Sequence, residues 1–501
     1  MKFKNLASLL CVAGAALLSQ TAQAEAVGDA IIVNTYLPGN QLMVSVTANP
    51  TGEKLVLWRD ETQSTYYVQR VDTAGILSPN KILLQLERAY GIKTTRSGNF
   101  AVMSQSQSVP QPGYFVNLYD RNGSLVTSPI RFSSFANAGG AVGMASNGSF
   151  AVLYSEYAGS NSTLFLKRYT ATGAQIGNAI TVAQSTNGAY LGGSDLAIDE
   201  SGNITVTWMN ILSSVPDVWI RRFNASGSPI TAPATVHLNT LGTQTGGQIA
   251  MNSSGSYIVS WNDNQPNTSI WNSYIQRYNE YGNPVNDAIR VNTTALPREP
   301  SFSAAMMDDG SFVAAWNTDD ELAVPASKAA IKAKQFRSDG TSVADEFFVS
   351  TPNGDGSAAS KVAMDMAGNF LVGWHSANAS TGYDAKIRAF KMDTLPPTQV
   401  LINGQTVQGI SGATGSWKYF KITVPAGKSN LSVNMNSTQT GDGDVYFRWG
   451  GYPTLNKWDI RPNLNGNNES FTVGTPPAGD FYIAIYGYAA YTSNNLTVSY
   501  W

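Results

Sequence analysis

The sequence predicts an all-β protein whose larger part is a seven-bladed β-propeller. Seven short apolar segments each follow a glycine, and in six of them an aromatic residue stands six positions beyond that glycine. The glycines are 46 to 58 residues apart, which fits one four-stranded sheet per repeat and hence a ring of radial blades. The pairs are Gly52 and Trp58, Gly98 and Ser104, Gly148 and Tyr154, Gly202 and Trp208, Gly255 and Trp261, Gly310 and Trp316, and Gly368 and Trp374.

The fifth repeat shows the four expected strands, named A to D from the propeller axis outwards. Strands A and B are predicted at Gly247–Asn252 and Ser256–Trp261, and strands C and D at Ser273–Asn279 and Ala288–Asn292. Large apolar residues alternate with small or polar ones in these segments, which is the period of a β-strand.

Glycine ends both short connections of a blade. The A-to-B turn ends in the seven glycines given above, because each precedes its strand B. Glycine readily adopts the positive φ that tight hairpin turns need, so both sets are predicted to be structural. The C-to-D turn ends in glycine in six copies, at Gly75, Gly123, Gly173, Gly227, Gly282 and Gly340.

The seventh repeat has no fourth strand of its own. Its strand C, Ala385–Phe390, runs into Leu395–Pro397. A matching segment lies near the N-terminus, where Asp29–Thr35 nearly duplicates Asp287–Thr293 of the fifth repeat. The N-terminal segment is therefore expected to pair with strand C of the last blade and close the ring, which removes exposed sheet edges.

The connections within a blade differ in length. The A-to-B and C-to-D turns are short and are expected on one face of the ring. The B-to-C and D-to-A connections are longer and irregular, and they belong on the opposite face, here called the long-loop face. Because binding residues concentrate on variable loops held by a rigid scaffold, any site is predicted on this face around the central channel.

Residues 1–24 have the pattern of a signal peptide, with a positive start, an apolar core and small residues at the cleavage site. They contain the single cysteine, Cys11, so the mature chain is expected to lack disulfides. No later stretch has the roughly 18 unbroken apolar residues of a membrane helix. The sequence thus predicts a secreted protein cleaved near Ala24, with the propeller at 25–394.

The charge of the chain bears on its partners. Charged residues make up 13% of the chain and the formal net charge is −2. Proteins that bind nucleic acid through its phosphates carry a basic surplus, so nucleic acid is not an expected partner. Turns rich in Asn, Ser, Thr and Gly suit an uncharged or weakly charged ligand, such as a surface glycan or matrix polysaccharide, bound by a monomer.

The repeat disappears after about residue 398, and residues 398–501 resemble the bacterial pre-peptidase C-terminal domain. The resemblance rests on motifs that include Gly415–Phe420, Val424–Gly427, Gly441–Arg448 and Ala478–Ile483. It implies a small β-sandwich, assigned to 395–501, that attaches exported proteins to insoluble substrates and has no catalytic role. The repeat of residues 29–393 is similar to a loosely defined class in large exported bacterial proteins, which implies architecture more firmly than activity.

The C-terminal segment departs from the pre-peptidase family in one respect. Members often carry a cysteine pair where this chain has Ile460 and Ser470. Asp442 and Asp444 are candidate calcium ligands, because calcium prefers hard carboxylate oxygens. A plain turn with solvated aspartates is the alternative, because no full ligand set is visible.

Three residues on the expected long-loop face could support catalysis. His375 follows Trp374 at the end of a strand B and titrates near neutrality, which suits proton transfer. In a polysaccharide lyase, His375 or Tyr157 would remove the proton α to a uronate carboxylate while Arg298 neutralised the acid. A solvent-facing loop histidine is the alternative for His375, and His237 is expected to be structural on an outer strand.

The same loops carry candidate ligand contacts. Exposed aromatic rings stack on sugars, and Trp271, Tyr190 and Tyr157 are predicted to do so. Arg88 and Glu299 are the predicted polar contacts. Each aromatic residue could instead anchor its loop on the propeller.

Familiar catalytic motifs do not occur in the sequence. It has no Gly-x-Ser-x-Gly elbow, His-Glu-x-x-His helix, P-loop or dinucleotide fingerprint. The leading hypothesis is a secreted protein that binds a glycan or extracellular polymer, with the C-terminal domain as a second attachment module. A polysaccharide lyase or glycoside hydrolase is the alternative, and an adhesive or structural surface protein is a third; a peptidase is not expected.

Overall fold

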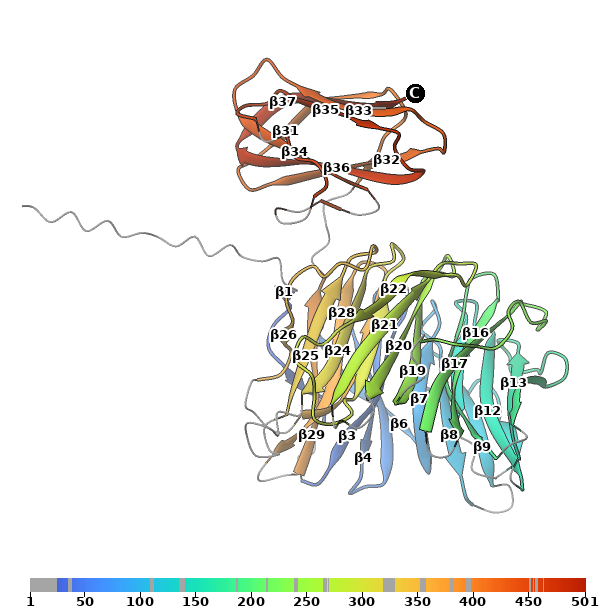
Figure 1. Ribbon diagram of the computed structural model, residues 1–501. Helices are drawn as coiled ribbons and strands as arrows, with labels where there is room; N and C mark the ends of the chain where they lie inside the picture. The colour runs from blue at the N-terminus through green and yellow to red at the C-terminus, as the bar shows by residue number, and fades with distance from the viewer. Residues whose placement is uncertain are drawn as a thin grey trace, which may run out of the picture.

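The computed structural model describes residues 25–501 apart from short gaps. The gaps are 35–37, 109–111, 135–139, 160, 186–187, 213–214, 238–241, 265–267, 269, 319–328, 352–356, 379–381, 393–397, 450–451, 454, 456–457 and 463. Every regular element among the described residues is a β-strand (Figure 1). The predicted signal peptide and the boundary near residue 395 lie outside the described residues.

Seven antiparallel sheets of the propeller follow one another along the chain, and each has strands A to D in spatial order. The A strands are β3 (Gln41–Ala48), β7 (Arg88–Thr94), β11 (Gly140–Met144), β15 (Tyr190–Ile198), β19 (Thr243–Met251), β23 (Phe302–Met306) and β27 (Ser357–Met364). The B strands are β4 (Lys54–Asp60), β8 (Phe100–Ser106), β12 (Phe150–Ala158), β16 (Ile204–Leu212), β20 (Tyr257–Asn264), β24 (Phe312–Thr318) and β28 (Asn369–Asn378).

The C and D strands complete each blade. The C strands are β5 (Thr65–Val71), β9 (Gly113–Tyr119), β13 (Asn161–Tyr169), β17 (Val215–Phe223), β21 (Trp271–Tyr278), β25 (Ala330–Phe336) and β29 (Gly382–Lys391). The D strands of the first six blades are β6 (Leu77–Leu84), β10 (Ile130–Ser134), β14 (Ile180–Ser185), β18 (Ala234–Thr235), β22 (Pro284–Arg290) and β26 (Phe347–Phe348).

The N-terminal segment supplies the outer strands of the seventh sheet. Strands β1 (Glu25–Ala26) and β2 (Ile31–Ile32) both pair with β29, and Ile31 lies opposite Ile387, as the sequence predicted. The pairing extends beyond β2, because the Val33 amide donates to the Ala385 carbonyl at 2.8 Å. The seventh blade also packs on the first, where Val33 and Trp58 share one apolar cluster with Ile387.

The core of the propeller lies between neighbouring blades. Strands B are buried along most of their length, and their side chains alternate between the two adjacent blades. Phe150 and Val152 pack toward blade 2, whereas Ala151 and Leu153 pack toward blade 4. The apolar residues that the repeat places on both sides of strand B therefore join each blade to its neighbours, and this rigid ring holds the loops.

The C-terminal domain is a sandwich of two four-stranded sheets. One sheet contains β30 (Gln399–Val400), β32 (Trp417–Val424), β36 (Gly479–Ala489) and β34 (Asp442–Trp449). The other contains β31 (Thr406–Gly412), β37 (Tyr491–Tyr500), β33 (Asn430–Asn436) and β35 (Glu469–Gly474). Their inner faces share a core that includes Val433, Phe447 and Ile483. No helix in the described part of the chain is long and apolar enough to cross a membrane.

Candidate functional site

The axis of the propeller is a narrow polar channel. Residues of the seven A strands line a cavity of about 290 Å³ there. Asp195 lies 4.0 Å from the Lys93 ammonium and accepts a 2.9 Å hydrogen bond from the Ile249 amide of the next blade. Burial lowers the pKa of Lys361, and Asp195 opposes that shift. The charged side chains of Lys93, Asp195 and Lys361 thus link different blades around the channel. Tyr90 also lines this cavity.

Two predicted contact residues on the long-loop face lie against each other. Tyr157 at the end of β12 stacks on Tyr190 at the start of β15, with ring centroids 5.1 Å apart and planes 12° apart. Tyr190 is 38% exposed, whereas Tyr157 is half-buried. Burial raises the pKa of Tyr157 well above its usual range, and its hydroxyl faces Tyr190, Ser155 and Ser162. The pair therefore presents the ring of Tyr190 on a rigid support.

Two further tyrosines extend this surface into blade 2. The rings of Tyr90 and Tyr114 lie 6.0 Å apart, and the Tyr90 hydroxyl donates a 2.5 Å hydrogen bond to Gln105. Burial raises the pKa of Tyr114 to about 12, with further interactions from Tyr90, Tyr190 and the exposed Arg88. Tyr90 is 43% exposed. We call Tyr90, Tyr114, Tyr157 and Tyr190 the tyrosine platform.

The tyrosine platform was only half predicted from the sequence. Tyr157, Tyr190 and Arg88 were among the predicted contacts, whereas Tyr90 and Tyr114 were missed. Tyr90 lies two residues after Arg88 in β7, and Tyr114 is the second residue of β9. Both tyrosines therefore lie near the N-terminal ends of strands that start at the long-loop face. Their position at the loop end of a strand was the available signal.

His375 is held inside the seventh blade. It lies in β28 opposite Ala358 and Ala385, and its ring meets the edge of Tyr383 at a centroid distance of 5.4 Å. Burial lowers the pKa of His375 to about 4, and Glu61 and Lys361 act on it in opposite directions. The imidazole is therefore neutral at pH 7 and only weakly basic, which suits a packed side chain better than a general base.

The other predicted residues of the long-loop face lie in blades 5 and 6. Trp271 pairs with Leu296 through two backbone hydrogen bonds and packs against the apolar cluster of Ile258 and Trp316, so it anchors its loop. Glu299 accepts a hydrogen bond from Thr245. Arg298 precedes Glu299 in the connection that leads into β23.

The three residues of the proposed lyase mechanism come from different parts of the ring. His375 belongs to blade 7 and Tyr157 to blade 3, which are not neighbours in the ring, and Arg298 precedes blade 6. The raised pKa of Tyr157 and the lowered pKa of His375 give neither group the properties of a base poised near neutrality.

The two candidate calcium ligands in the sandwich both have protein partners. Asp444 is buried and pairs with Arg461 at 2.7 Å, and Asp442 accepts a 2.9 Å hydrogen bond from the Gly466 amide. The Arg461 guanidinium also lies 4.8 Å from the Tyr446 ring centroid. Among the described residues, no group of three or more His, Cys, Asp and Glu side chains could hold a metal ion. Calcium binding here stays a prediction.

Comparisons with known proteins cover the C-terminal domain and the propeller separately. Residues 418–487 match the bacterial pre-peptidase C-terminal domain, as the sequence predicted. Alkaline serine exoprotease A of Vibrio alginolyticus is 39% identical over 107 residues, covering 21% of this chain and 20% of that protein. The virulence metalloprotease of Vibrio anguillarum is 30% identical over 149 residues, covering 29% and 23%. The chain thus spans under a quarter of the length of either relative.

Among solved structures, the polysaccharide lyase Uly1 is similar to most of this chain. It is 10% identical, with a TM-score of 0.46, and the match covers 72% of this chain and 91% of that one. At this level of similarity no activity is carried over.

Proposed function

We propose that this is an exported protein that binds a glycan or extracellular polymer through the tyrosine platform, with the C-terminal domain as an accessory attachment module. The observation that carries the proposal is the stacked pair of Tyr157 and Tyr190 beside Tyr90 on the long-loop face. Two of these rings, Tyr90 and Tyr190, are 43% and 38% exposed. Aromatic faces of this kind stack on the apolar faces of sugar rings.

The polar groups around the platform suit a weakly acidic or neutral polymer. Arg88 is exposed and interacts with Tyr114, so a carboxylate or sulfate on a sugar would find a cation beside the rings. The hydroxyls of the exposed Tyr90 and Tyr190 add hydrogen-bonding groups for sugar hydroxyls, and Gln105 holds the Tyr90 hydroxyl in place. Two weak modules on one chain raise the effective concentration at a polymer surface, which supports a role for the sandwich in attachment.

The test is retention of the purified mature protein on a panel of insoluble and gel-embedded polysaccharides, neutral and acidic. Retention by at least one polymer is expected, and Tyr190→Ala and Tyr90→Ala should each weaken it several-fold. Tyr281→Ala is the matched control, because Tyr281 is 71% exposed but lies in the C-to-D turn of blade 5, on the other face. Equal retention of all three variants would contradict the proposal.

The same samples also test the enzyme alternative. Incubation with each polysaccharide should release neither unsaturated nor reducing-end products. Product that forms with the wild type and disappears in His375→Ala would favour the lyase or hydrolase hypothesis over binding.

A further inference from the structure

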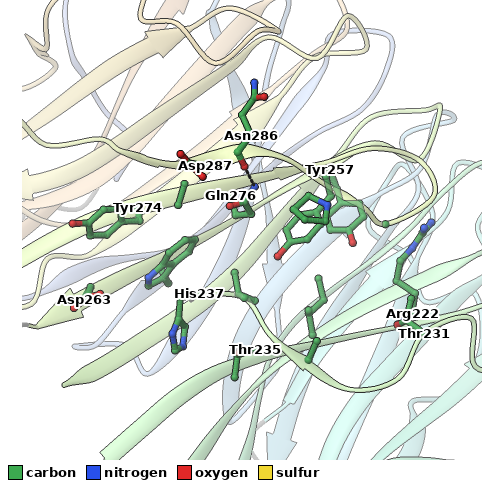
Figure 2. Close-up of a pocket in the computed structure, with 18 of the residues that line it drawn as sticks. Arg222, Thr231, Thr235, His237, Tyr257, Asp263, Tyr274, Gln276, Asn286 and Asp287 are labelled. Carbon is green, nitrogen blue, oxygen red and sulfur yellow. Dashed lines mark hydrogen bonds between the residues drawn. The ribbon is translucent and has the colours of Figure 1, made fainter. Parts of the chain in front are cut away.

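A groove lies in the side of the propeller between blades 4 and 5. It has a volume of about 640 Å³ and is lined mainly by apolar and aromatic side chains. Figure 2 shows Tyr274, Asp263 and His237 at one end of the groove and Arg222 and Thr231 at the other. The groove is separate from the tyrosine platform, which spans blades 2 to 4.

The groove exists because one position of the repeat is truncated. In six blades, strand D carries Ile or Phe opposite an apolar residue of strand C, and in blade 4 this residue is Ala234, opposite Ile220. The six larger residues are Ile82, Ile130, Ile180, Ile289, Phe347 and Ile31.

Several of these isoleucines fill the space beside the next blade. Ile130 lies against Gly173 and Ile180 against Gly227, where each glycine ends a C-to-D turn. At the equivalent glycine of blade 5, Gly282, the neighbours are Arg222 and Tyr257, and Gly282 lines the groove together with Ala234. The small side chain of Ala234 thus leaves the aromatic face of blade 5 accessible from the groove.

The aromatic pair at one end of the groove, Trp261 and Tyr274, has an equivalent pair in blade 1 that lies next to a lysine ammonium. In blade 1, Trp58 stacks on Tyr67, and the Lys81 ammonium lies 4.4 Å from the Tyr67 ring centroid and 5.6 Å from that of Trp58. In blade 5, Trp261 and Tyr274 stack in the same register at 5.7 Å.

The position of Lys81 is occupied by Ala288 in blade 5. Both residues directly precede the apolar residue that recurs in strand D, Ile82 in blade 1 and Ile289 in blade 5, and Ala288 lines the groove. None of the described lysines and arginines makes a cation–π contact with Trp261 or Tyr274, whereas Arg222 covers Tyr257 at the other end. Blade 5 thus has the aromatic site without the ammonium.

Carboxylates lie beside this aromatic site. Asp263 is 6% exposed, and its Oδ1 has no hydrogen-bond partner among the described residues. Burial raises the pKa of Asp263, although a hydrogen bond from Gln244 and the charge of His237 oppose the shift. Asp287 lies exposed on the rim, and Asp217 lies 3.7 Å from His237 Nε2. An ammonium group placed here would lie over the faces of both rings and beside a desolvated carboxylate, and both interactions favour its positive charge.

We propose that the groove binds an organic cation, an ammonium group on an aromatic or aliphatic body, with the ammonium over Trp261 and Tyr274 and the body along the groove toward Tyr257. The ligand's ammonium would take the place that Lys81 occupies in blade 1. Its apolar part would fill the volume that Ala234 leaves open.

The test uses 2-phenylethylamine as the probe and 2-phenylethanol as its uncharged analogue, with binding followed by ligand-observed NMR and tryptophan fluorescence. The amine should bind at least about tenfold more tightly than the alcohol. Ala288→Lys supplies an internal ammonium and should weaken amine binding at least about tenfold, and Asp263→Asn should weaken it several-fold. Ala179→Lys is the matched control, because Ala179 is the exposed equivalent in blade 3, and it should leave binding unchanged.

A second variant tests the volume of the groove. Ala234→Ile restores the side chain that most other blades carry, and it should abolish amine binding. If Ala234→Ile does not fold, the exposed Ala288→Lys variant still decides the question. Equal affinity for amine and alcohol, amine binding that survives in Ala288→Lys, or no binding at millimolar amine would each overturn the proposal.

Discussion

Lys54 and Asp365 form a fully buried ion pair that joins the first blade to the last. The Lys54 ammonium lies 2.9 Å from Asp365 Oδ2, and the two side chains are 2% and 1% exposed. Lys54 also donates to the Gly52 carbonyl, and Asp365 accepts the Ala367 and Asn369 amides in its turn. In all six other blades the position of Lys54, two residues after the A-to-B glycine, carries an apolar or aromatic residue, such as Phe100 and Phe312.

Replacing Lys54 by Met is expected to destabilise the propeller by about 3 to 5 kcal/mol, because it leaves Asp365 charged and buried without its partner. Equilibrium unfolding in urea measures the loss. Lys391→Met is the control, because Lys391 is an exposed lysine of blade 7 and should change the free energy of unfolding by less than about 0.5 kcal/mol.

The double variant Lys54→Met/Asp365→Asn separates the ion pair from simple packing. Removing both charges should recover a large part of the loss, because no buried charge is then unpaired. A double variant that is as unstable as the sum of the two single variants would show that the pair contributes no coupling between the first and last blades.

Much of the fold was predictable because the repeat is local. A glycine at each A-to-B turn and an aromatic residue six positions later mark strand B in every blade but the second, and the likeness of Asp29–Thr35 to Asp287–Thr293 predicted the pairing of Ile31 with Ile387. Both signals lie within short segments whose conformation depends on neighbours in sequence.

The site was less predictable because it depends on how loops of different blades approach one another. Nothing local indicates that Tyr114 of blade 2 interacts with Tyr190 of blade 4, or that Trp271 pairs with Leu296. The groove is different, because alignment of the seven D strands shows Ala234 where the others carry Ile or Phe. The replacement of Ile or Phe by Ala is visible in the sequence. Its consequence becomes clear only from the structure, which shows which turn glycine of the next blade the larger side chain covers.

The lowered pKa of His375 predicts a pH dependence of stability. The folded chain holds His375 with a pKa of about 4, below its usual value of 6.5, so between these values the unfolded chain binds more protons. The stabilisation by neutral His375 is complete above about pH 6.5 and is lost as the pH falls toward 4, by about 3 kcal/mol in total. Urea unfolding of wild type and His375→Gln at pH 7 and pH 4.5 measures it.

Carboxylates titrate equally in both proteins, so the difference between the two losses reports the imidazole alone. The wild type should therefore lose more stability than His375→Gln over this pH range. Parallel losses in the two proteins would mean that the imidazole is accessible to water and titrates normally.

The ion pair of Arg461 with Asp444 predicts how the sandwich responds to calcium. The guanidinium already provides a positive charge 2.7 Å from the carboxylate, so neither added Ca²⁺ nor a chelator should shift the thermal unfolding of the sandwich. Arg461→Ala removes this charge from the buried Asp444 and should destabilise the domain by about 1 to 4 kcal/mol. Calcium-dependent stabilisation of the wild type would instead support the calcium hypothesis for Asp442 and Asp444.

Gly173 shows that a turn glycine can also be required by the neighbouring blade. Its φ is +88°, and a Cβ built there would lie 2.5 Å from Ile130 Cδ1. Gly173→Ala should therefore combine the left-handed backbone cost of about 1 to 2 kcal/mol with an overpacking cost of about 1 to 3 kcal/mol. Gly188→Ala has a similar φ of +79° but meets nothing within 4 Å, so only the backbone cost is expected. Urea unfolding compares the two, and Ile130→Val should relieve part of the Gly173→Ala loss; equal losses at both glycines would mean that Ile130 adjusts without cost.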